Sequence, residues 1–190
     1  MTLEEVIQGI VPADQEAMGR AKARWDSIAK PLGSLGALED AVIRIAGMTG
    51  SPDVDISKRA VVVMCADNGV VAEGVTQTGQ EVTAIVAENM SSGDTSVCAM
   101  SRQAGAEVVP VDIGTAVPLS GPRIRQKCIR RGTANMTQGP AMSREEAVQA
   151  ILAGVEIAQE LRGQGVNLLA TGEMGIGNTT TSSALAAVLL

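Results

Sequence analysis

Histidine, phenylalanine and tyrosine are absent from the 190 residues, and Trp25 is the single tryptophan. The lack of histidine excludes serine–histidine and cysteine–histidine catalytic pairs, histidine metal sites and imidazole acid–base chemistry within this chain. Any proton transfer must therefore use carboxylates, lysine or water. Because aromatic residues make up 1% and aliphatic ones are abundant, the core must be aliphatic.

The composition of the chain argues against nucleic acid as a partner. Base stacking needs aromatic side chains, and binding to phosphates needs an excess of positive charge, whereas the net charge here is -6. One basic cluster interrupts the acidic balance, and we interpret it mainly as a solvated, strand-rich surface stretch. Its members are Arg123, Arg125, Lys127, Arg130 and Arg131.

The cysteines are few and odd in number: Cys65, Cys98 and Cys128. They lack metal-ligand spacing and lie among apolar neighbours, so we expect buried free thiols in a reducing compartment. Residues 1–5 lack the features of a signal peptide, and no apolar run reaches transmembrane length. The sequence therefore predicts a cytoplasmic protein without membrane contact, and it indicates neither a metal nor a cofactor.

The pattern along the chain alternates between helices and strands. A helix over residues 13–29 with Asp14 as its cap and a second helix over 35–46 form a predicted helical N-terminal segment, residues 1–52. The predicted core, residues 53–190, has apolar strands at 60–66, 107–113 and 166–170. Helices are expected from 80 to 90, from Asp94 to Gly105, from a capping box at 143–146 to Leu161, and from Thr179 onward. The fold class is therefore α/β, a parallel Rossmann-like sheet flanked by helices.

Two positions complicate this prediction. Pro110 lacks an N–H donor, so its strand should lie at a sheet edge or be irregular there. The apolar helix 184–190 has no capping residue, which leads us to expect that the fold continues beyond Leu190. The alternative is a terminal helix in a hydrophobic groove or a dimer interface. Because an uncovered apolar helix needs a partner surface, we expect a homo-oligomer.

The strongest local signal is the glycine-rich segment from Gly172 to Thr180, which joins an apolar strand to a helix. Backbone N–H groups at such a turn attract anions. Its glycine spacing matches a P-loop, but Asn178 replaces the lysine that holds a triphosphate. It also approaches the dinucleotide fingerprint, with Thr180 in place of the last glycine. The plain alternative is a tight turn with a threonine cap.

Further polar residues follow the first strand. Asp67, Asn68 and Gly69 lie where open α/β sheets bind ligands, although Asn-Gly is equally a common tight turn. Gln80 and Glu81 stand at a predicted helix start, where Gln80 either reaches a ligand or caps the helix.

Four segments in order, 30–39, 66–75, 80–83 and 172–180, closely resemble the nicotinate-nucleotide:dimethylbenzimidazole phosphoribosyltransferase family. The resemblance runs through essentially the whole chain but covers only about the N-terminal half of the family's usual length. Asn68 departs from the family's common Asp-His-Gly-Val motif. The glutamate that serves as the family's catalytic base lies beyond Leu190.

The resemblance implies transfer of phosphoribose from nicotinate mononucleotide to an aromatic base, dimethylbenzimidazole or a related one, for cobamide (vitamin B12) biosynthesis. It implies that the base is bound near Asp67, Asn68 and Gln80, and that Glu173 is a secondary base or, more simply, a structural carboxylate. An inactive fragment is the expected state of this chain. The alternatives are a non-catalytic binding half-protein that needs a partner, and a dinucleotide-dependent oxidoreductase. The phosphate and ribose should contact Glu173, Gly175, Ile176, Gly177, Asn178, Thr179 and Thr180.

Overall fold

The computed structural model describes residues 1–190 and divides into two compact units, Met1–Ile56 and Ser57–Leu190. The first unit contains only helices. Helix α2 begins, as predicted, with Asp14 as its cap, whose carboxylate accepts a hydrogen bond of 2.9 Å from the Ala17 N–H. A short helix with no sequence prediction precedes it and begins with a capping box of Thr2 and Glu5. The helices of this unit are α1 (Leu3–Gln8), α2 (Gln15–Ser27) and α3 (Ala37–Thr49).

Small residues let α2 and α3 pack closely. Ala17, Ala21 and Ala46 are buried, and a Cβ atom on Gly47 would lie 2.6 Å from the Met18 Cγ. Between the helices, the Lys30 Nζ forms an ion pair of 2.7 Å with Glu39 and lies 5.5 Å from the centre of the Trp25 ring. The Lys30 ammonium also lowers the pKa of Glu39.

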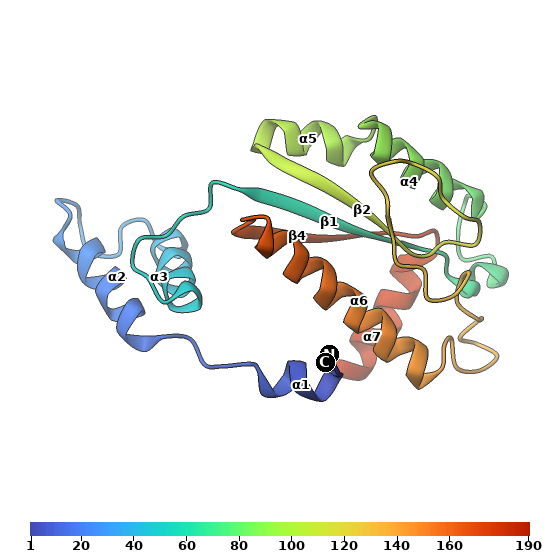
Figure 1. Cartoon of the computed structure of the whole chain (residues 1–190), viewed down its shortest axis with the longest axis horizontal. Helices are drawn as coiled ribbons and strands as arrows, with labels where there is room; N and C mark the ends of the chain where they lie inside the picture. The colour runs from blue at the N-terminus through green and yellow to red at the C-terminus, as the bar shows by residue number, and fades with distance from the viewer. The chain divides into compact units, whose positions relative to one another are not determined.

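The second unit is built on one parallel sheet with the strand order β3-β2-β1-β4. Every neighbouring pair of strands is parallel, which confirms the predicted α/β fold class. Strand β1 is central and pairs along its length with both β2 and β4 (Figure 1). The strands are β1 (Arg59–Ala66), β2 (Ala106–Gly114), β3 (Arg125–Gln126) and β4 (Leu168–Met174).

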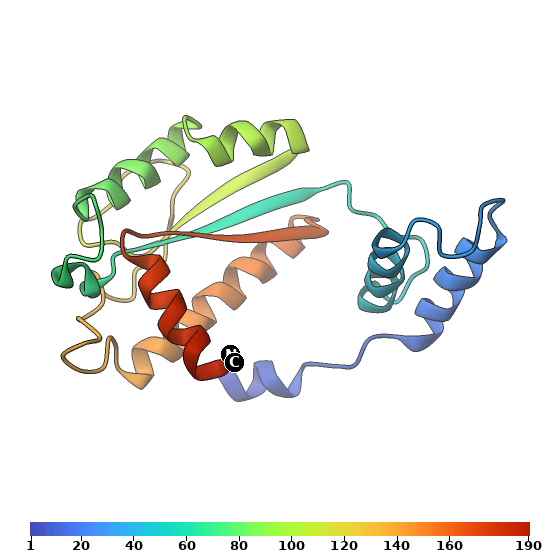
Figure 2. The same cartoon turned by 180° about the vertical axis from the view of Figure 1, so that it is seen from behind.

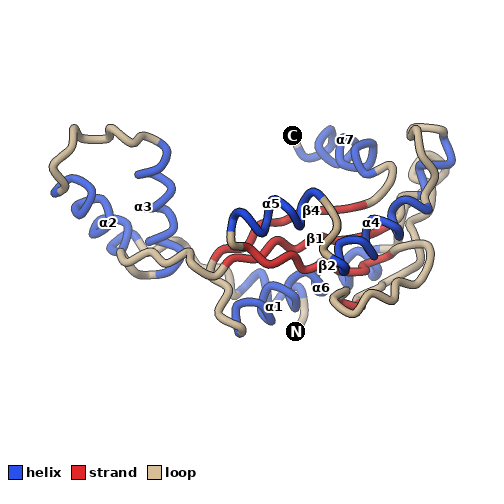
Figure 3. The backbone as a smooth tube through the Cα atoms, turned by 90° about the horizontal axis from the view of Figure 1, so that it is seen from above, coloured by secondary structure: helices blue, strands red, loops and turns tan.

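Helices cover both faces of the sheet (Figures 1 and 3). On one face, α4 and α5 pack Ala87, Met90 and Cys98 against Val63 and Cys65 of β1. On the other, Ile157 and Leu161 of α6 pack against β1 and β2. Helix α7 follows the carboxyl end of β4 (Figure 2) and has no buried residue. The α-helices of this unit are α4 (Glu81–Ser92), α5 (Ser96–Ala104), α6 (Arg144–Gly163) and α7 (Asn178–Leu189). A short 3-10 helix, η1 (Gly69–Glu73), follows β1.

The last strand differs from its prediction. It runs from Leu168 to Met174, later than the expected 166–170, and its residues 168–171 are exposed. An apolar sequence led us to expect a buried strand, but β4 is an edge strand and pairs only with β1. Helix α5 also begins later than expected, with Thr95 rather than Asp94 as its cap.

Pro110 lies where the sequence predicts, at a free strand edge. Its partner in β1 is Val63, and pairing of β2 with β3 begins only at Val111. The side of β2 that faces away from β1 therefore has no strand beside Pro110, and the missing N–H costs no ladder bond.

Ion pairs hold much of the basic cluster against α6. Arg125 pairs with Glu160 at 3.0 Å, Lys127 with Glu156 at 2.8 Å and Arg130 with Glu146 at 3.2 Å. Only two residues of this segment are strand, so the strand-rich part of our interpretation was wrong. Cys65 and Cys98 are buried free thiols as expected, and Cys128 is half-buried. None of the helices combines the length and apolarity that crossing a membrane requires.

Candidate functional site

The candidate site lies where β1 and β4 end side by side. Cys65 near the end of β1 is opposite Met174 at the end of β4. Asp67 and Asn68 follow the first strand, and the glycine-rich turn follows the second. Because parallel strands place their carboxyl ends at the same sheet edge, these two sequence-predicted groups come together there.

Two glycines allow the turn to approach β1 closely. A Cβ atom on Gly175 would overlap the carbonyl oxygen of Ala66, and one on Gly177 would lie 2.9 Å from the Val71 Cγ2. Gly177 has a φ of 85° and serves as the cap of α7 without any side-chain hydrogen bond. The cap of α7 is therefore a glycine and not the threonine that the sequence suggested.

Most polar groups of the turn have protein partners. The N–H of Ile176 donates to the Thr83 hydroxyl at 3.0 Å, and the N–H of Asn178 donates to the Gly175 carbonyl at 3.0 Å. The N–H groups of Gly177 and Thr179 donate to no other group of the chain. These two donors, at the positive end of the α7 dipole, can receive an anion.

Glu173 lies beside the turn, exposed at the end of β4. Its Oε1 atom accepts a hydrogen bond from the side-chain amide of Asn178. The carboxylate is thus tied to the first residue of α7, as expected of a structural carboxylate. Thr180 is part of the same helix start, where its N–H donates to the Gly177 carbonyl at 3.2 Å.

The residues predicted to bind a base are gathered at the end of β1. Asp67 is almost completely buried, and its Oδ2 atom accepts a hydrogen bond of 2.7 Å from the Ala116 N–H. The side-chain amide of Gln80 donates to the Asn68 carbonyl at 3.0 Å. The Asn68 side chain faces the turn, where it contacts Ile176 and Thr181.

Sequence reasoning missed two residues of this site, Thr83 and Thr181. Thr83 has no exposed surface and shares the buried face of α4 with Ala87 and Met90. The sequence did carry a signal for Thr83, because it stands at helical spacing from the apolar Ala87 and Met90. A hydroxyl buried on such a face needs a hydrogen-bond partner, which indicates a contact with another segment. Thr181 carried no comparable signal, since it stands in a run of polar residues.

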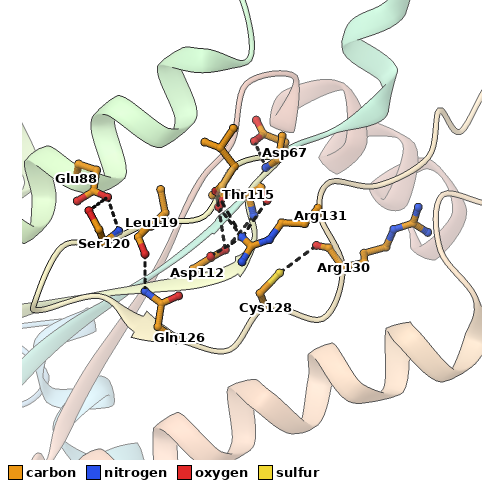
Figure 4. A network of polar contacts seen from close by, with 12 residues as sticks. Asp67, Glu88, Asp112, Thr115, Leu119, Ser120, Gln126, Cys128, Arg130 and Arg131 are labelled. Carbon is orange, nitrogen blue, oxygen red and sulfur yellow. Dashed lines mark hydrogen bonds and ion pairs between the residues drawn. The ribbon is translucent and has the colours of Figure 1, made fainter.

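A second network of polar contacts shapes the end of β2 (Figure 4). The guanidinium of Arg131 contacts the buried carboxylate of Asp112 at 2.8 Å, which raises the pKa of Arg131. The same carboxylate accepts hydrogen bonds from the N–H and the hydroxyl of Thr115, at 2.9 and 3.0 Å. Arg130 extends in a different direction, so the two neighbouring arginines do not form one basic site. This network supports the loop that bonds to Asp67 and leaves Asp112 no free oxygen for catalysis.

An apolar pocket of about 330 Å³ adjoins α7. The hydroxyl of Thr133 accepts a hydrogen bond from the Gly69 N–H, and that of Thr181 donates to Asn68. The pocket therefore offers little to a phosphate. Its lining includes Val70, Thr133, Met136, Met142, Thr181 and Leu185.

A family model described as phosphoribosyltransferase matches residues 10–190. Among curated proteins, the chain is 48% identical over 190 residues to nicotinate-nucleotide–dimethylbenzimidazole phosphoribosyltransferase of Ruminiclostridium cellulolyticum, covering 54% of that protein. It is 46% identical over 189 residues to the protein of the same name from Clostridium acetobutylicum, again covering 54%. The chain therefore spans about half the length of the curated relatives it matches.

A solved structure gives the same result for the fold. The chain superimposes on nicotinate-nucleotide-dimethylbenzimidazole phosphoribosyltransferase from Thermus thermophilus with a TM-score of 0.88 and 42% sequence identity. The match covers 93% of this chain and 54% of that one. At this level of identity, the comparison supports both the fold and the relationship.

Proposed function

The chain belongs to the nicotinate-nucleotide:dimethylbenzimidazole phosphoribosyltransferase family, and on that premise we propose that it binds the phosphoribosyl part of nicotinate mononucleotide at the glycine-rich turn. The observation that carries the proposal is the pair of unpartnered N–H groups, on Gly177 and Thr179, at the start of α7. Two backbone donors at a helix N-terminus suit one phosphate group. No lysine stands at the turn to hold the further phosphates of a triphosphate.

The remaining predicted residues surround this anion position. Gly175 and Ile176 form the turn, and Asn178 and Thr180 begin the helix. We place the ribose near Glu173, whose carboxylate is bonded to Asn178. We place the aromatic base on the side of Asp67 and Asn68, at the end of β1, and of Gln80, at the start of α4.

In the reaction that we propose for the complete enzyme, a ring nitrogen of dimethylbenzimidazole or a related base attacks C1′ of the ribose. The bond from C1′ to nicotinate breaks as the new bond forms, and the configuration at C1′ inverts. Nicotinate leaves with the electron pair, which neutralises its pyridinium nitrogen, so the leaving group needs no acid. The attacking ring loses one proton to a general base. The enzyme therefore chiefly positions donor and acceptor, and no metal enters this scheme.

We propose that these 190 residues bind the nucleotide but turn it over slowly. Glu173 is tied to Asn178, and Asp67 is buried with one carboxylate oxygen bonded to Ala116. The Asp67 Oδ1 atom has no partner but lies buried, and we propose that neither carboxylate serves as the general base. Loss of a general base typically costs about a hundredfold to ten-thousandfold in rate. The resulting product would serve cobamide biosynthesis, and the free thiols fit a cytoplasmic setting.

Calorimetric titration of the chain with nicotinate mononucleotide tests this proposal, with nicotinate riboside and ATP as comparison ligands. We expect the mononucleotide to bind, the riboside to bind more weakly, and ATP to gain nothing from its extra phosphates. In ¹⁵N NMR spectra, the Gly177 and Thr179 amide signals should move on addition of the mononucleotide. Tight binding of ATP together with no binding of the mononucleotide would show the assignment to be wrong.

A further inference from the structure

Asn68 connects two segments that are far apart in the sequence. Its side-chain Nδ2 donates a hydrogen bond of 3.1 Å to the carbonyl of Ile176, which is 108 residues later. Its Oδ1 accepts a hydrogen bond of 2.9 Å from the Thr181 hydroxyl, which is 113 residues later. The amide group of one side chain therefore holds both the glycine-rich turn and the first turn of α7.

The bond to Ile176 has a consequence for the neighbouring N–H. The Ile176 carbonyl and the Gly177 N–H belong to one planar trans peptide unit, in which the two groups point in opposite directions. When Asn68 holds the carbonyl, it also sets the direction of the Gly177 N–H. That N–H has no protein partner.

The preceding peptide unit is held separately. The N–H of Ile176 donates to the buried hydroxyl of Thr83 at 3.0 Å, which orients the unit between Gly175 and Ile176. Thr83 from α4 and Asn68 from the end of β1 therefore fix the peptide planes on both sides of Ile176. Gly177, with a φ of 85°, completes the turn that these planes require.

Asn68 is itself fixed at both ends. Its backbone carbonyl accepts a hydrogen bond of 3.0 Å from the Gln80 side chain, and Thr181 orients its Oδ1 atom. Because the Asn68 side chain is held in this way, it can keep the Gly177 N–H in one direction. Little reordering of the turn is then needed when an anion binds.

We propose that Asn68 is a positioning residue for phosphate binding, acting through the peptide unit between Ile176 and Gly177 and not through contact with the phosphate. This inference rests on the proposed function, since it assigns how the same turn is prepared for its ligand. It gives Asn68 a role on the phosphate side of the site, in addition to the base-side position predicted from the sequence.

The variant Asn68→Ala tests the inference through two ligands that differ only in the phosphate. Loss of a hydrogen bond is worth about 0.5 to 1.5 kcal/mol, so the affinity for nicotinate mononucleotide should fall by about 2- to 13-fold. The affinity for nicotinate riboside should fall clearly less, because the riboside has no phosphate for the Gly177 N–H to bind. A merely structural role would instead weaken both ligands to the same extent.

Thr181→Val provides a second variant that leaves Asn68 in place. It removes the hydroxyl that orients Oδ1, so we expect a loss in the same direction and smaller than for Asn68→Ala. Ser182→Ala is the matched control, because it removes an exposed hydroxyl from the next position of α7 and should leave the affinity unchanged. Thr181→Val keeps the question answerable if Asn68→Ala does not fold.

The Gly177 amide signal in ¹⁵N spectra of the ligand-free chain gives a readout that does not depend on binding. We expect it to shift in Asn68→Ala and in Thr181→Val, and to stay in place in Ser182→Ala. If the wild-type chain binds no mononucleotide, the proposed function fails, whereas the Gly177 signal still decides whether Asn68 orients the turn. The inference would be overturned if both variants kept the wild-type ratio of mononucleotide affinity to riboside affinity and also showed an unchanged Gly177 signal.

Discussion

The Ile176 N–H and the Thr83 hydroxyl form a hydrogen bond of 3.0 Å across 93 residues of sequence. This bond ties the glycine-rich turn to helix α4, which packs on the sheet on the side of Val63 and Cys65. The position of the candidate site is thus coupled to the core and not only to the strand that precedes it.

Replacing Thr83 should therefore destabilise the fold. Thr83→Val keeps the shape but removes the acceptor, and leaves the Ile176 N–H without a partner next to a fully buried side chain. We expect a loss of about 1 to 3 kcal/mol in the free energy of unfolding, measured by urea denaturation. Thr83→Ser retains the hydroxyl and should lose clearly less. A Thr83→Val variant as stable as the wild type would contradict the prediction.

Gly175→Ala should also destabilise the fold, because the added Cβ would overlap the Ala66 carbonyl oxygen. The turn would have to move away from β1, at a cost of about 1 to 3 kcal/mol. Gly19→Ala is the matched control, since Gly19 lies inside α2 and nothing stands within 4 Å of its added Cβ. That variant should be more stable than the wild type by about 0.5 to 1 kcal/mol. Thermal or urea unfolding checks the prediction, because the free energy of unfolding should fall in Gly175→Ala and rise in Gly19→Ala.

Glu73 should make stability depend on acidic pH. Hydrogen bonds from the Asn135 and Thr137 side chains lower the pKa of this carboxyl below its ordinary value of 4.5. A lowered pKa stabilises the fold above the unfolded value, and this contribution is lost as the pH falls through the folded pKa. The urea midpoint should thus fall less between pH 7 and acidic pH in Glu73→Gln than in the wild type. Identical pH profiles would show that Glu73 contributes nothing.

The thiols should differ in reactivity. Burial raises the pKa of the Cys65 thiol to about 12 and also raises that of Cys128, which is only half-buried. At pH 8 a pKa of about 12 leaves roughly 10⁻⁴ of Cys65 as the reactive thiolate. Alkylation followed by mass spectrometry should label Cys128 first. Because a raised pKa stabilises the fold below the unfolded value of about 8.5, the contribution of Cys65 is lost as the pH rises through about 12.

The exposed apolar side chains of α7 should cause this 190-residue chain to self-associate. Leu185, Val188 and Leu189 are 59%, 84% and 78% exposed. Burial of one such side chain is worth about 1.5 to 3 kcal/mol, so covering several together favours association. Replacing Val188 and Leu189 with serine should shift the chain toward monomer in sedimentation velocity experiments, whereas Ser183→Ala should not. A wild-type chain that is monomeric at every concentration would contradict the prediction.

The sequence by itself determined the local elements. Helical spacing and caps such as Asp14 and the box at Ser143 and Glu146 predicted α2 and α6, because these signals depend on residues a few positions apart. A continuous apolar run predicted β1, and glycines between a strand and a helix predicted the anion-binding turn. The family resemblance, confirmed by the comparisons, then supplied the chemistry that local patterns cannot express.

Only the tertiary structure decided which segments meet. The apolar sequence of β4 does not reveal that it is an exposed edge strand, because exposure depends on the order of strands in the sheet. Thr83 and Asn68 likewise have partners about a hundred residues away, and no local period records such a distance. The direction of the Gly177 N–H, on which phosphate binding rests in our proposal, is therefore set by long-range hydrogen bonds that exist only once β1, α4 and β4 have packed together.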